Sequence, residues 1–435
     1  MGDFDLAGFA LHPQRAAVLG EVHARPFTRL TAPLTVLRFA FLAQGEVAAA
    51  DRARFVAFCT AHGQAPPEEG AKHHQVMIGE VQLRWEQHSE FSTFTWIQPH
   101  AAAASHRFGE IEDDLAALVR SMLQSGQLLV AVKLEVEQGA DALARAQQLF
   151  ERSSLAMVAV RSGPAVVASD FRADADGFTR ILVCNDGLTP GRLGALVQRV
   201  LEIETYRTLA LLGLPAALAL VPAVDSIGRR LVEVLEEMQG AADLKLNNRL
   251  LEELTALAAS LERGAAASLF RFGASKAYNE LVQARLAIIE GAEIAGYPTF
   301  SSFLARRMAP AMRTCVTVEE RQANLSIKLA RAADLLRTRV DVELEEQNRD
   351  LLRSMNDRTR LQLRLQSTVE GLSVAAIGYY VVSLFGYVAK GAHEAGLRID
   401  PSLATAAFVP VAVAVIWIAT RSIRRRHLRR DAAED

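Results

Sequence analysis

The hydrophobic and polar positions of this chain divide it into three parts. Residues 1 to about 190 alternate short apolar runs of strand type with amphipathic runs of helical period, separated by turn residues. From Thr189 onward the strand pattern stops and helical periodicity continues. The last quarter changes from a charged helical pattern to two uncharged apolar segments. This order predicts an α/β part, an all-α part and a membrane anchor.

The strand-type runs of the first part predict a mixed β-sheet. Expected helices cover Val47–His62, Gly109–Leu123 and Ala140–Phe150. Strands mixed with helices, one hairpin among them, favour an α/β or α+β sandwich and leave the strand order open. The expected strands are Leu34–Leu42, a hairpin of Gln75–Trp85 with Phe91–Ile97, then Leu128–Val136, Leu155–Val160, Ala165–Ser169 and Thr179–Cys184.

The second part predicts a series of helices. Thr189 and Pro190 suit the cap and first position of a helix that continues through Tyr206. The apolar stretch Leu209–Val224 is short for a membrane span and holds two prolines, so we interpret it as a buried helix–turn–helix corner. Further helices are expected at Ile227–Gln239, Leu244–Leu261, Ala274–Ala295 and Leu304–Met312.

A long helix is expected to begin near Val318, with Thr317 as its cap and Glu320 as the capping-box partner. Neither proline nor glycine interrupts Val318 to Glu370, which is roughly 80 Å of helix. Apolar residues recur there at spacings of three, four or seven between charged ones, the pattern of a coiled-coil-like stalk or bundle. Its unbroken link to the first apolar segment predicts one rod shared by the soluble and membrane parts.

The two apolar segments, 371–389 and 401–420, carry no charge and are each roughly 30 Å long, enough to cross a bilayer core. Arginines precede the first segment and follow the second, which places both ends in the cytoplasm. The membrane-flanking arginines after the hairpin are Arg421, Arg424, Arg425 and Arg426. The alternative is two buried helices of a soluble core.

The expected domains are 1–188 (α/β), 189–316 (helical), 317–370 (stalk helix), 371–420 (transmembrane hairpin) and 421–435 (basic tail).

Composition narrows the function classes. The net charge of −2 over 435 residues predicts no nucleic-acid partner. The three cysteines lie far apart without a paired motif, which fits a reducing compartment. Phosphate-binding loops, dinucleotide fingerprints and nucleophile elbows are absent from the sequence, so we do not expect an enzyme. An enzyme built on Glu21, His23 and His88 would need those side chains in one pocket.

Eight of the ten histidines lie between His12 and His106, close to carboxylates. Imidazole and carboxylate groups form the usual ligand set for a divalent metal, although no metal motif is present and the cofactor stays unknown. An arginine before proline has a restricted backbone and can pair with a carboxylate or grip an anion. The alternative is a polar network that ties the N-terminal segment to the sheet. The candidates are His12, Glu21, His23, Arg25, His73, His74, Glu86, His88 and Glu90.

The first apolar segment carries small residues at helical spacing. Such a stripe lets helices approach closely in lipid, or lines a narrow pore in a symmetric oligomer. Neither apolar segment has an ionisable residue in its middle, which argues against a proton-coupled carrier. The stripe consists of Gly371, Ala375, Gly378, Val382, Gly386 and Ala389.

Four stretches of the chain resemble a bacterial family described as predicted membrane-anchored proteins, a domain of unknown function. They are LHPQRAAVLGEVHARPFTRLTAP, LRWEQHSEFSTFTW, SDFRADADGF and LEIETYRTLALLGLP, and the likeness spans nearly the whole chain. The resemblance implies a bacterial, membrane-anchored protein, and with the two apolar segments it predicts a multi-pass protein of the inner membrane that contacts lipid. It implies no activity and no functional residues.

The order of parts also resembles that of CorA-type magnesium transporters, which are pentameric channels with both termini inside the cell. Their Gly-Met-Asn signature should follow the first span, and this chain has FGYVAKG there. Lys390 at that position would repel divalent cations. We therefore expect a homo-oligomer, a pentamer if CorA-like, that is a candidate channel or transporter of an unknown ion. The alternative is a non-transporting scaffold or sensor whose His/Glu-rich domain binds a metal, an anion or a protein.

Overall fold

A computed structural model describes residues 10, 12–15, 18–19, 27–100, 111–122, 124, 126–139, 141–240, 244–395 and 400–431, and it includes side chains up to residue 420 and at 422. Residue contacts divide the chain into two compact units. Unit 1 comprises Met1–Gly240 and Leu250–Ala333, and unit 2 comprises Ala241–Arg249 and Asp334–Asp435. Each unit is described by itself below.

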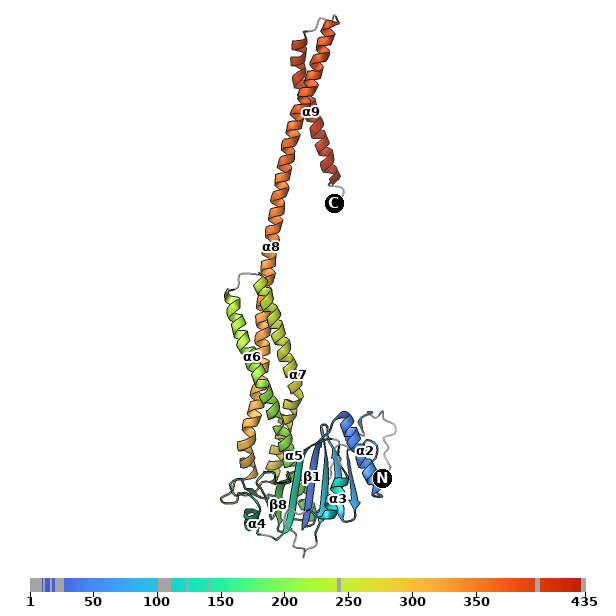
Figure 1. Ribbon diagram of the computed structural model, residues 1–435, viewed down its shortest axis with the longest axis vertical. Coiled ribbons are helices and arrows are strands. Elements are labelled where there is room, and N and C mark those ends of the chain that lie inside the picture. Colours follow the sequence, from blue (N-terminus) through green and yellow to red (C-terminus); the bar gives the residue numbers. More distant parts are fainter. Residues whose placement is uncertain are drawn as a thin grey trace. The chain divides into compact units, whose positions relative to one another are not determined.

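Unit 1 contains one mixed sheet of eight strands, as the alternation of strand and helix patterns predicts (Figure 1). Its order is β2-β3-β4-β1-β5-β8-β7-β6. All neighbouring strands are antiparallel except β5 and β8, which run parallel. The strands are β1 (Leu34–Leu42), β2 (His73–Ile78), β3 (Val81–Gln87), β4 (Phe91–Pro99), β5 (Gln127–Gln138), β6 (Ala156–Ala159), β7 (Ala165–Ser169) and β8 (Thr179–Asn185).

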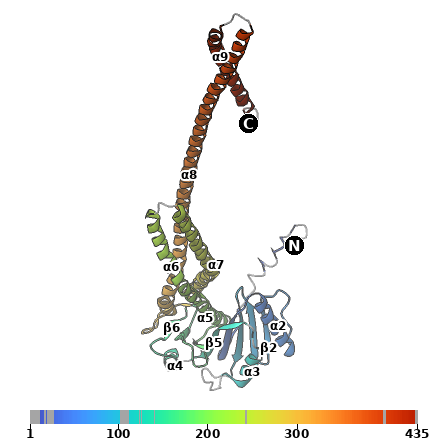
Figure 2. The same cartoon turned by 45° about the horizontal axis from the view of Figure 1, so that its top comes forward.

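Helices cover both faces of the sheet (Figures 1 and 2). On one face, α2 (Gly45–Ala61) and α3 (Asp113–Ser121) pack on Trp85 and Trp96, and α4 (Ala142–Leu149) packs on the strands near β7. On the other face lie α5 (Pro190–Leu211), the last part of α7 (Leu244–Ile289) and the first part of α8 (Phe300–Glu394). Unit 1 is therefore a three-layer α/β/α sandwich.

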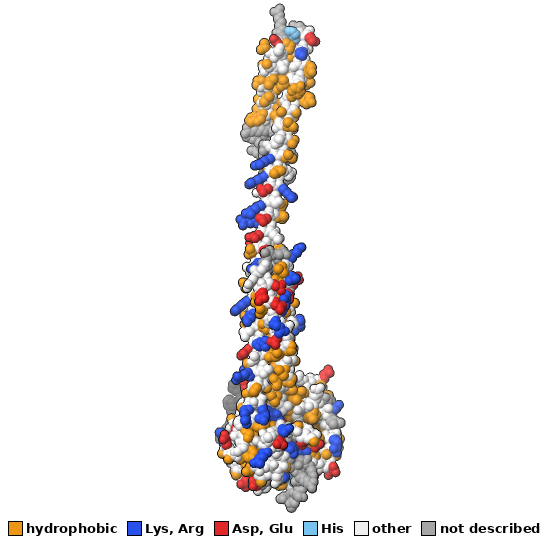
Figure 3. All heavy atoms as spheres, turned by 60° about the vertical axis from the view of Figure 1, so that its left-hand side comes forward, with side chains coloured by type: hydrophobic (Ala, Val, Ile, Leu, Met, Phe, Trp, Pro, Cys, Tyr) orange, Lys and Arg blue, Asp and Glu red, His pale blue; other side chains and the backbone are white. Residues whose placement is uncertain are grey.

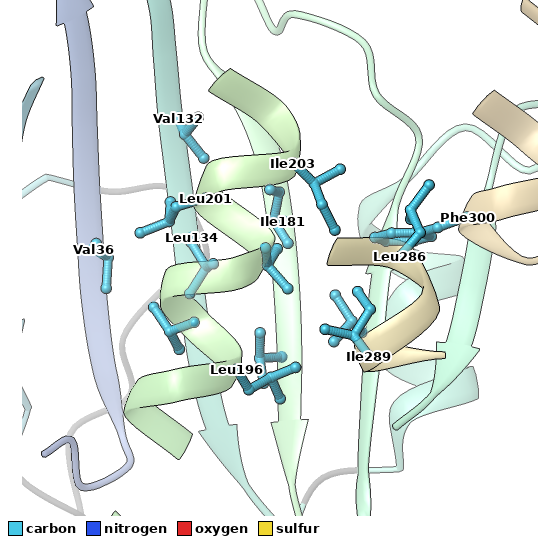
Figure 4. Packing of buried hydrophobic residues seen from close by; sticks show 14 of the residues in the cluster. Val36, Val132, Leu134, Ile181, Leu196, Leu201, Ile203, Leu286, Ile289 and Phe300 are labelled. Carbon is cyan, nitrogen blue, oxygen red and sulfur yellow. The ribbon is translucent and has the colours of Figure 1, made fainter. Parts of the chain in front are cut away.

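The larger core lies between the sheet and α5 (Figure 4). Alternate residues of β5, Val132 and Leu134, point to this face because side chains along a strand alternate with period two. They meet Leu196 and Leu201 of α5, and α7 and α8 close the cluster with Leu286, Ile289 and Phe300. The sheet thus buries its apolar face against helices that come from three distant parts of the chain.

One close crossing fixes the segment before β1 to α5. A Cβ atom on Gly194 would lie 1.7 Å from the backbone oxygen of Thr28, so only glycine fits there. The amide of Leu30 also donates to the carbonyl of Pro190 at 3.0 Å. Residues 27–30 therefore lie across the beginning of α5, held by backbone contact.

Helices α6 (Gly213–Gly240), α7 and α8 pack together beyond the sheet in unit 1. A Cβ atom on Gly213 would lie 2.6 Å from the hydroxyl of Ser275 and 3.0 Å from the sulfur of Cys315, so three helices meet at this glycine. Arg230 of α6 donates to Glu253 of α7 at 2.5 and 2.9 Å. These contacts make the helical part of unit 1 a bundle.

Unit 2 contains the remainder of α8 and the helix α9 (Pro401–Asp431), which form a hairpin. The rings of Phe385 and Phe408 stack at a centroid distance of 3.9 Å, so the two apolar segments lie side by side. Hydrophobic side chains cover this hairpin, whereas charged side chains follow the preceding part of α8 (Figure 3). Three helical stretches of the described chain are long and apolar enough to cross a membrane: Pro190–Gly240, Phe300–Glu394 and Pro401–Thr420.

The structure corrects several expected element bounds. The stretch Gln75–Trp85 is not one strand, because Gly79 adopts a positive φ of 62° and turns β2 into β3. The expected helices Leu244–Leu261 and Ala274–Ala295 fall in the single helix α7, which ends at Ile289, before the expected end at Ala295. The long helix begins at Phe300, not near Val318, because α8 continues through Pro310. Thr317 is therefore inside a helix and caps nothing.

In place of the corner expected at Leu209–Val224, Leu212 alone separates α5, which ends at Leu211, from α6, which begins at Gly213, and it keeps a helical backbone conformation. This stretch is only partly buried: Leu209 and Ala217 are fully enclosed, whereas Leu218 is 56% exposed. Helix α5 begins at Pro190 as expected, but the Thr189 side chain makes no capping hydrogen bond. The helix start was thus predicted correctly, whereas the corner and its complete burial were not.

Candidate functional site

A buried ionic network lies on the α5 face of the sheet, centred on Glu86. Arg84 donates to Glu86 at 2.5 Å, and a guanidinium nitrogen of Arg38 lies 3.5 Å from the other carboxylate oxygen. Arg38 also donates to Thr95 at 3.1 Å, and Thr93 donates to Glu86 at 3.3 Å. These residues share one face because they alternate along β1, β3 and β4.

The charges around Glu86 determine its ionisation. Burial would raise the pKa of this carboxyl, but nearby Arg38 and Arg84, with His88 and the hydrogen bond from Arg84, outweigh it and lower the pKa to about 2. Glu86 is only 3% exposed, so this is a paired, buried carboxylate. The arginines occupy both of its oxygens, and the group balances charge within the fold.

The network continues into the helices. Arg84 donates to Gln198 at 3.2 Å, and Gln198 donates to Glu202 at 2.9 Å. Arg285 of α7 forms an ion pair with Glu202 of α5. A continuous polar path therefore joins strand β3 to two helices through an otherwise apolar layer.

A second polar cluster lies at the turn between β3 and β4. Glu90 is 1% exposed and accepts from Arg271 of α7 at 2.5 and 3.4 Å. The Tyr278 hydroxyl also hydrogen-bonds to Glu90, and burial together with this bond to a carboxylate raises the pKa of Tyr278 well above its usual range. The hydroxyl is therefore held in its neutral form as a hydrogen-bond donor.

A surface pocket of about 650 Å³ opens beside this cluster. Its wall is aromatic: Tyr206 and Tyr278 stack at 5.7 Å, and His88 lies on Phe91 at 4.1 Å with the two rings nearly parallel. The other lining residues include two cations, and the set comprises Arg52, Gly70, Ala71, Lys72, Gln87, His88, Ser89, Phe91, Tyr206, Tyr278 and Leu281. We call this the His88 pocket.

The His88 pocket has the chemistry of a binding site. Arg52 donates to the backbone oxygens of Ala71 and Glu68 at 2.6 Å each, which fixes the loop that forms one rim. Lys72 is exposed on that rim. Cationic groups beside aromatic rings suit a small anion or an anionic ring compound.

The structure brings only some of the expected ligand residues together. His88 lies close enough to Glu86 to interact with its charge, and His73 is the residue opposite Glu86 in the register of β2 and β3. His74 faces the opposite layer, where its ring meets Phe55 and its Nε2 lies 2.8 Å from the backbone oxygen of Ala65. His12 is exposed and accepts from the amide of Gln14 at 3.2 Å.

Glu21, His23 and Arg25 lie outside the described residues, so their expected role stays a prediction. Among the residues that are described, no group of three or more histidines, cysteines or acidic side chains could hold a metal ion. The buried carboxylates Glu86 and Glu90 face arginines instead. In the described part of the chain, the donor set therefore fits anion binding and charge pairing better than a metal.

Sequence reasoning missed the partners of these carboxylates. Arg38 stands in the middle of the apolar run LTVLRFAFL, and a charge at such a position signals a buried pairing. Arg84 and Glu86 are two residues apart on one strand and so share a face. The helical partners Glu202, Arg271 and Tyr278 are distant in sequence and carry no comparable signal.

The small-residue stripe of the first apolar segment faces α9 along part of its length. A Cβ atom on Gly386 would lie 3.6 Å from the Thr405 hydroxyl, and one on Gly378 would lie 4.0 Å from Ile416. Ala389 is buried, whereas Gly371 and Ala375 are exposed and Val382 is half-buried. Gly378 and Gly386 thus lie against the second helix of the hairpin. The side chains of Arg421, Arg424, Arg425 and Arg426 lie outside the described ones.

A family model matches most of this chain. A search of curated proteins finds no relative of this chain. The family model described as "Protein of unknown function (DUF3422)" matches residues 10–427, which include the sheet, the helical bundle and the apolar hairpin. The chain therefore belongs to the DUF3422 family of proteins of unknown function.

Proposed function

We propose that this protein is a homo-oligomeric ion channel or transporter of the bacterial inner membrane, with a CorA-like architecture and both termini in the cytoplasm. The observation that carries the proposal is helix α8. It is unbroken from Phe300, which packs on the sheet, to Glu394, beyond the first apolar segment. A helix of this kind transmits a change in the soluble domain directly to a membrane span.

The apolar hairpin supports the same proposal. Its two segments pack closely through Gly378, Gly386 and Phe385, which suits a membrane-embedded hairpin. The first segment has no charged residue, so ions would be selected by polar groups, by pore width or by the linker. Lys390 near the linker disfavours divalent cations, so the ion series to be tested includes monovalent ions.

Flux through proteoliposomes tests the proposal. The full chain is reconstituted, and uptake of Mg²⁺, Ni²⁺, K⁺ and Cl⁻ is followed with ion-sensitive dyes. We expect flux of at least one ion above that of empty liposomes. Gly386→Val should lower it by pushing Thr405 away, whereas Gly371→Val, with open space around its Cβ position, serves as the matched control. Absence of flux for every cation and anion would refute a channel.

The His88 pocket favours a second function, a membrane-anchored sensor that binds a small anion. Its exposed Lys72 and its aromatic wall support this alternative. Calorimetry of the full chain in detergent with inorganic phosphate tests it. We expect binding that Lys72→Ala weakens and that Lys276→Ala, on an exposed part of α7 outside the pocket, leaves unchanged. No heat of binding with the wild-type chain would exclude phosphate-type ligands.

A further inference from the structure

Part of helix α8 in unit 2 is a single helix with an uncovered apolar face. Every residue from Leu344 to Val369 is exposed. Five of the eight apolar residues there fall on one face at spacings of four, seven or ten residues, and the other three, Leu352, Leu361 and Leu363, lie to its sides. The five are Leu344, Leu351, Met355, Leu365 and Val369. We call this the stalk face. Leu351 is 62% exposed and Leu365 is 68% exposed.

An isolated helix with such a stripe is unstable in water, because most helical stability in proteins comes from packing of an apolar face. The repeat of the stalk face is that of a coiled coil, whose natural partner is another helix with the same repeat. Asn348, Arg358 and Gln362 interrupt the stripe. Polar residues at such positions fix register and oligomer number in coiled coils.

The same face continues into the first apolar segment, on the side away from α9. Counting onward at about 100° per residue, it passes through Ala376, Tyr380, Ser383 and Tyr387. We call this the span face. Tyr380 and Tyr387 are 72% and 73% exposed, whereas Gly378 and Gly386 on the other side contact α9. The hairpin therefore leaves a hydroxyl-bearing surface uncovered.

Tyr380 lies at the centre of the segment 371–389, about 14 Å along the helix from either end. Membrane tyrosines normally lie at the interfaces, where water satisfies their hydroxyl groups. The hydroxyl at this depth cannot reach water, and a polar group in lipid needs a protein partner. A phenol both donates and accepts, so the same surface on a second copy is complementary to it.

We propose that a second copy of this chain docks in parallel on α8, through the stalk face and the span face together. Copies in one membrane share their orientation, so equivalent residues meet at the same level. The proposal deepens the proposed function and rests on it for the membrane placement. It assigns the axis of the oligomer to the hydroxyl-bearing side of the first span, and the small-residue stripe to packing within each copy.

Cysteine cross-linking in membranes tests the stalk face. The native cysteines should cross-link little, because burial raises the pKa of Cys59, Cys184 and Cys315 and so keeps their thiols protonated and unreactive. With a mild oxidant, Leu351→Cys should give covalent dimers of the full chain. Arg353→Cys, two residues further along but on the opposite side of the helix, is the matched control and should give far fewer. Equal cross-linking at both positions, or none at either, would overturn the proposal.

A pair of tyrosine variants tests the span face. Tyr380→Phe removes the hydroxyl group and should weaken the oligomer in detergent by at least about threefold, as measured by sedimentation equilibrium. The neighbour Tyr379 is equally exposed, at 71%, but lies to the side of the face, so Tyr379→Phe should have little effect. Equal effects of the two variants would refute the role of this face.

The flux assay separates this proposal from the channel. Cross-linking at Leu351→Cys without any ion flux would support the proposed interface and refute the channel. Flux without face-specific cross-linking would keep the channel and refute this interface.

Discussion

Replacing Glu86 with glutamine measures how much the buried ionic network stabilises unit 1. The pKa of Glu86 falls from an ordinary value of 4.5 to about 2 in the folded chain. Each pKa unit is worth about 1.4 kcal/mol, so the ionised group stabilises the fold by about 3 kcal/mol. Glutamine resembles the protonated carboxyl in size, so Glu86→Gln should remove about that amount at pH 7.

The pH dependence of this difference follows from the direction of the shift. A carboxylate with a lowered pKa stabilises the fold above its unfolded pKa, and this contribution is lost as pH falls through the folded value. The difference between wild type and Glu86→Gln should therefore be constant above about pH 5 and shrink as the pH falls from 4.5 toward 2.

Tryptophan fluorescence offers a local assay. Trp85 and Trp96 are both buried in the sheet, and the third tryptophan, Trp417, lies in α9. In a Trp417→Phe background, urea unfolding of the full chain in detergent reports on the sheet alone. The control Glu80→Gln changes an exposed acid in the turn between β2 and β3 and should shift the free energy of unfolding by less than about 0.5 kcal/mol. A loss below 1 kcal/mol for Glu86→Gln, or one independent of pH, would refute the reasoning.

Three further substitutions test the packing of unit 1 with the same fluorescence. Gly194→Ala places a methyl group against the backbone of the segment before β1 and should lower the free energy of unfolding by about 1–3 kcal/mol. Gly191→Ala, which has open space around its Cβ position, should leave the stability unchanged. Equal losses of stability for the two variants would contradict the close crossing. Leu134→Ala should cost about 2–5 kcal/mol, and Leu128→Ala, on the same strand but 53% exposed, less than 1 kcal/mol. Tyr278→Phe removes the hydrogen bond to a buried carboxylate and should cost about 1–3 kcal/mol; no loss would mean that Arg271 alone satisfies that carboxylate.

Local patterns determined how much of the fold could be predicted. The bounds of β1 match the apolar run Leu34–Leu42, because strong strand formers end there at turn residues. The turn at Gly79 was missed because strand-type residues continue on both sides of it. The start of α8 was placed near Val318 because Thr317 and Glu320 match a capping box, whereas the expected helix Leu304–Met312 continues past this point without a break.

The sequence identified two carboxylates of the site but not their partners. The carboxylates Glu86 and Glu90 were identified as candidates, and both occupy buried polar clusters. Their partners depend on which helices pack on the sheet. Arg285 and Arg271 become neighbours of the sheet only because α7 returns to it, and this tertiary contact leaves no periodic signal.

The way in which α7 and α8 complete the large core has a consequence for biosynthesis. The last residues in the chain to cover the apolar face of the sheet are Leu286 and Ile289 of α7 and then residues of α8 as far as Met308. A nascent chain that has emerged only through β8 holds a complete set of strands with one face still open to solvent. Such intermediates expose aggregation-prone surface. The ribosome must synthesise more than a hundred residues beyond β8 before that face closes, and the first apolar segment follows about sixty residues later. Closure of the sheet's core and synthesis of the apolar hairpin therefore follow each other closely during translation.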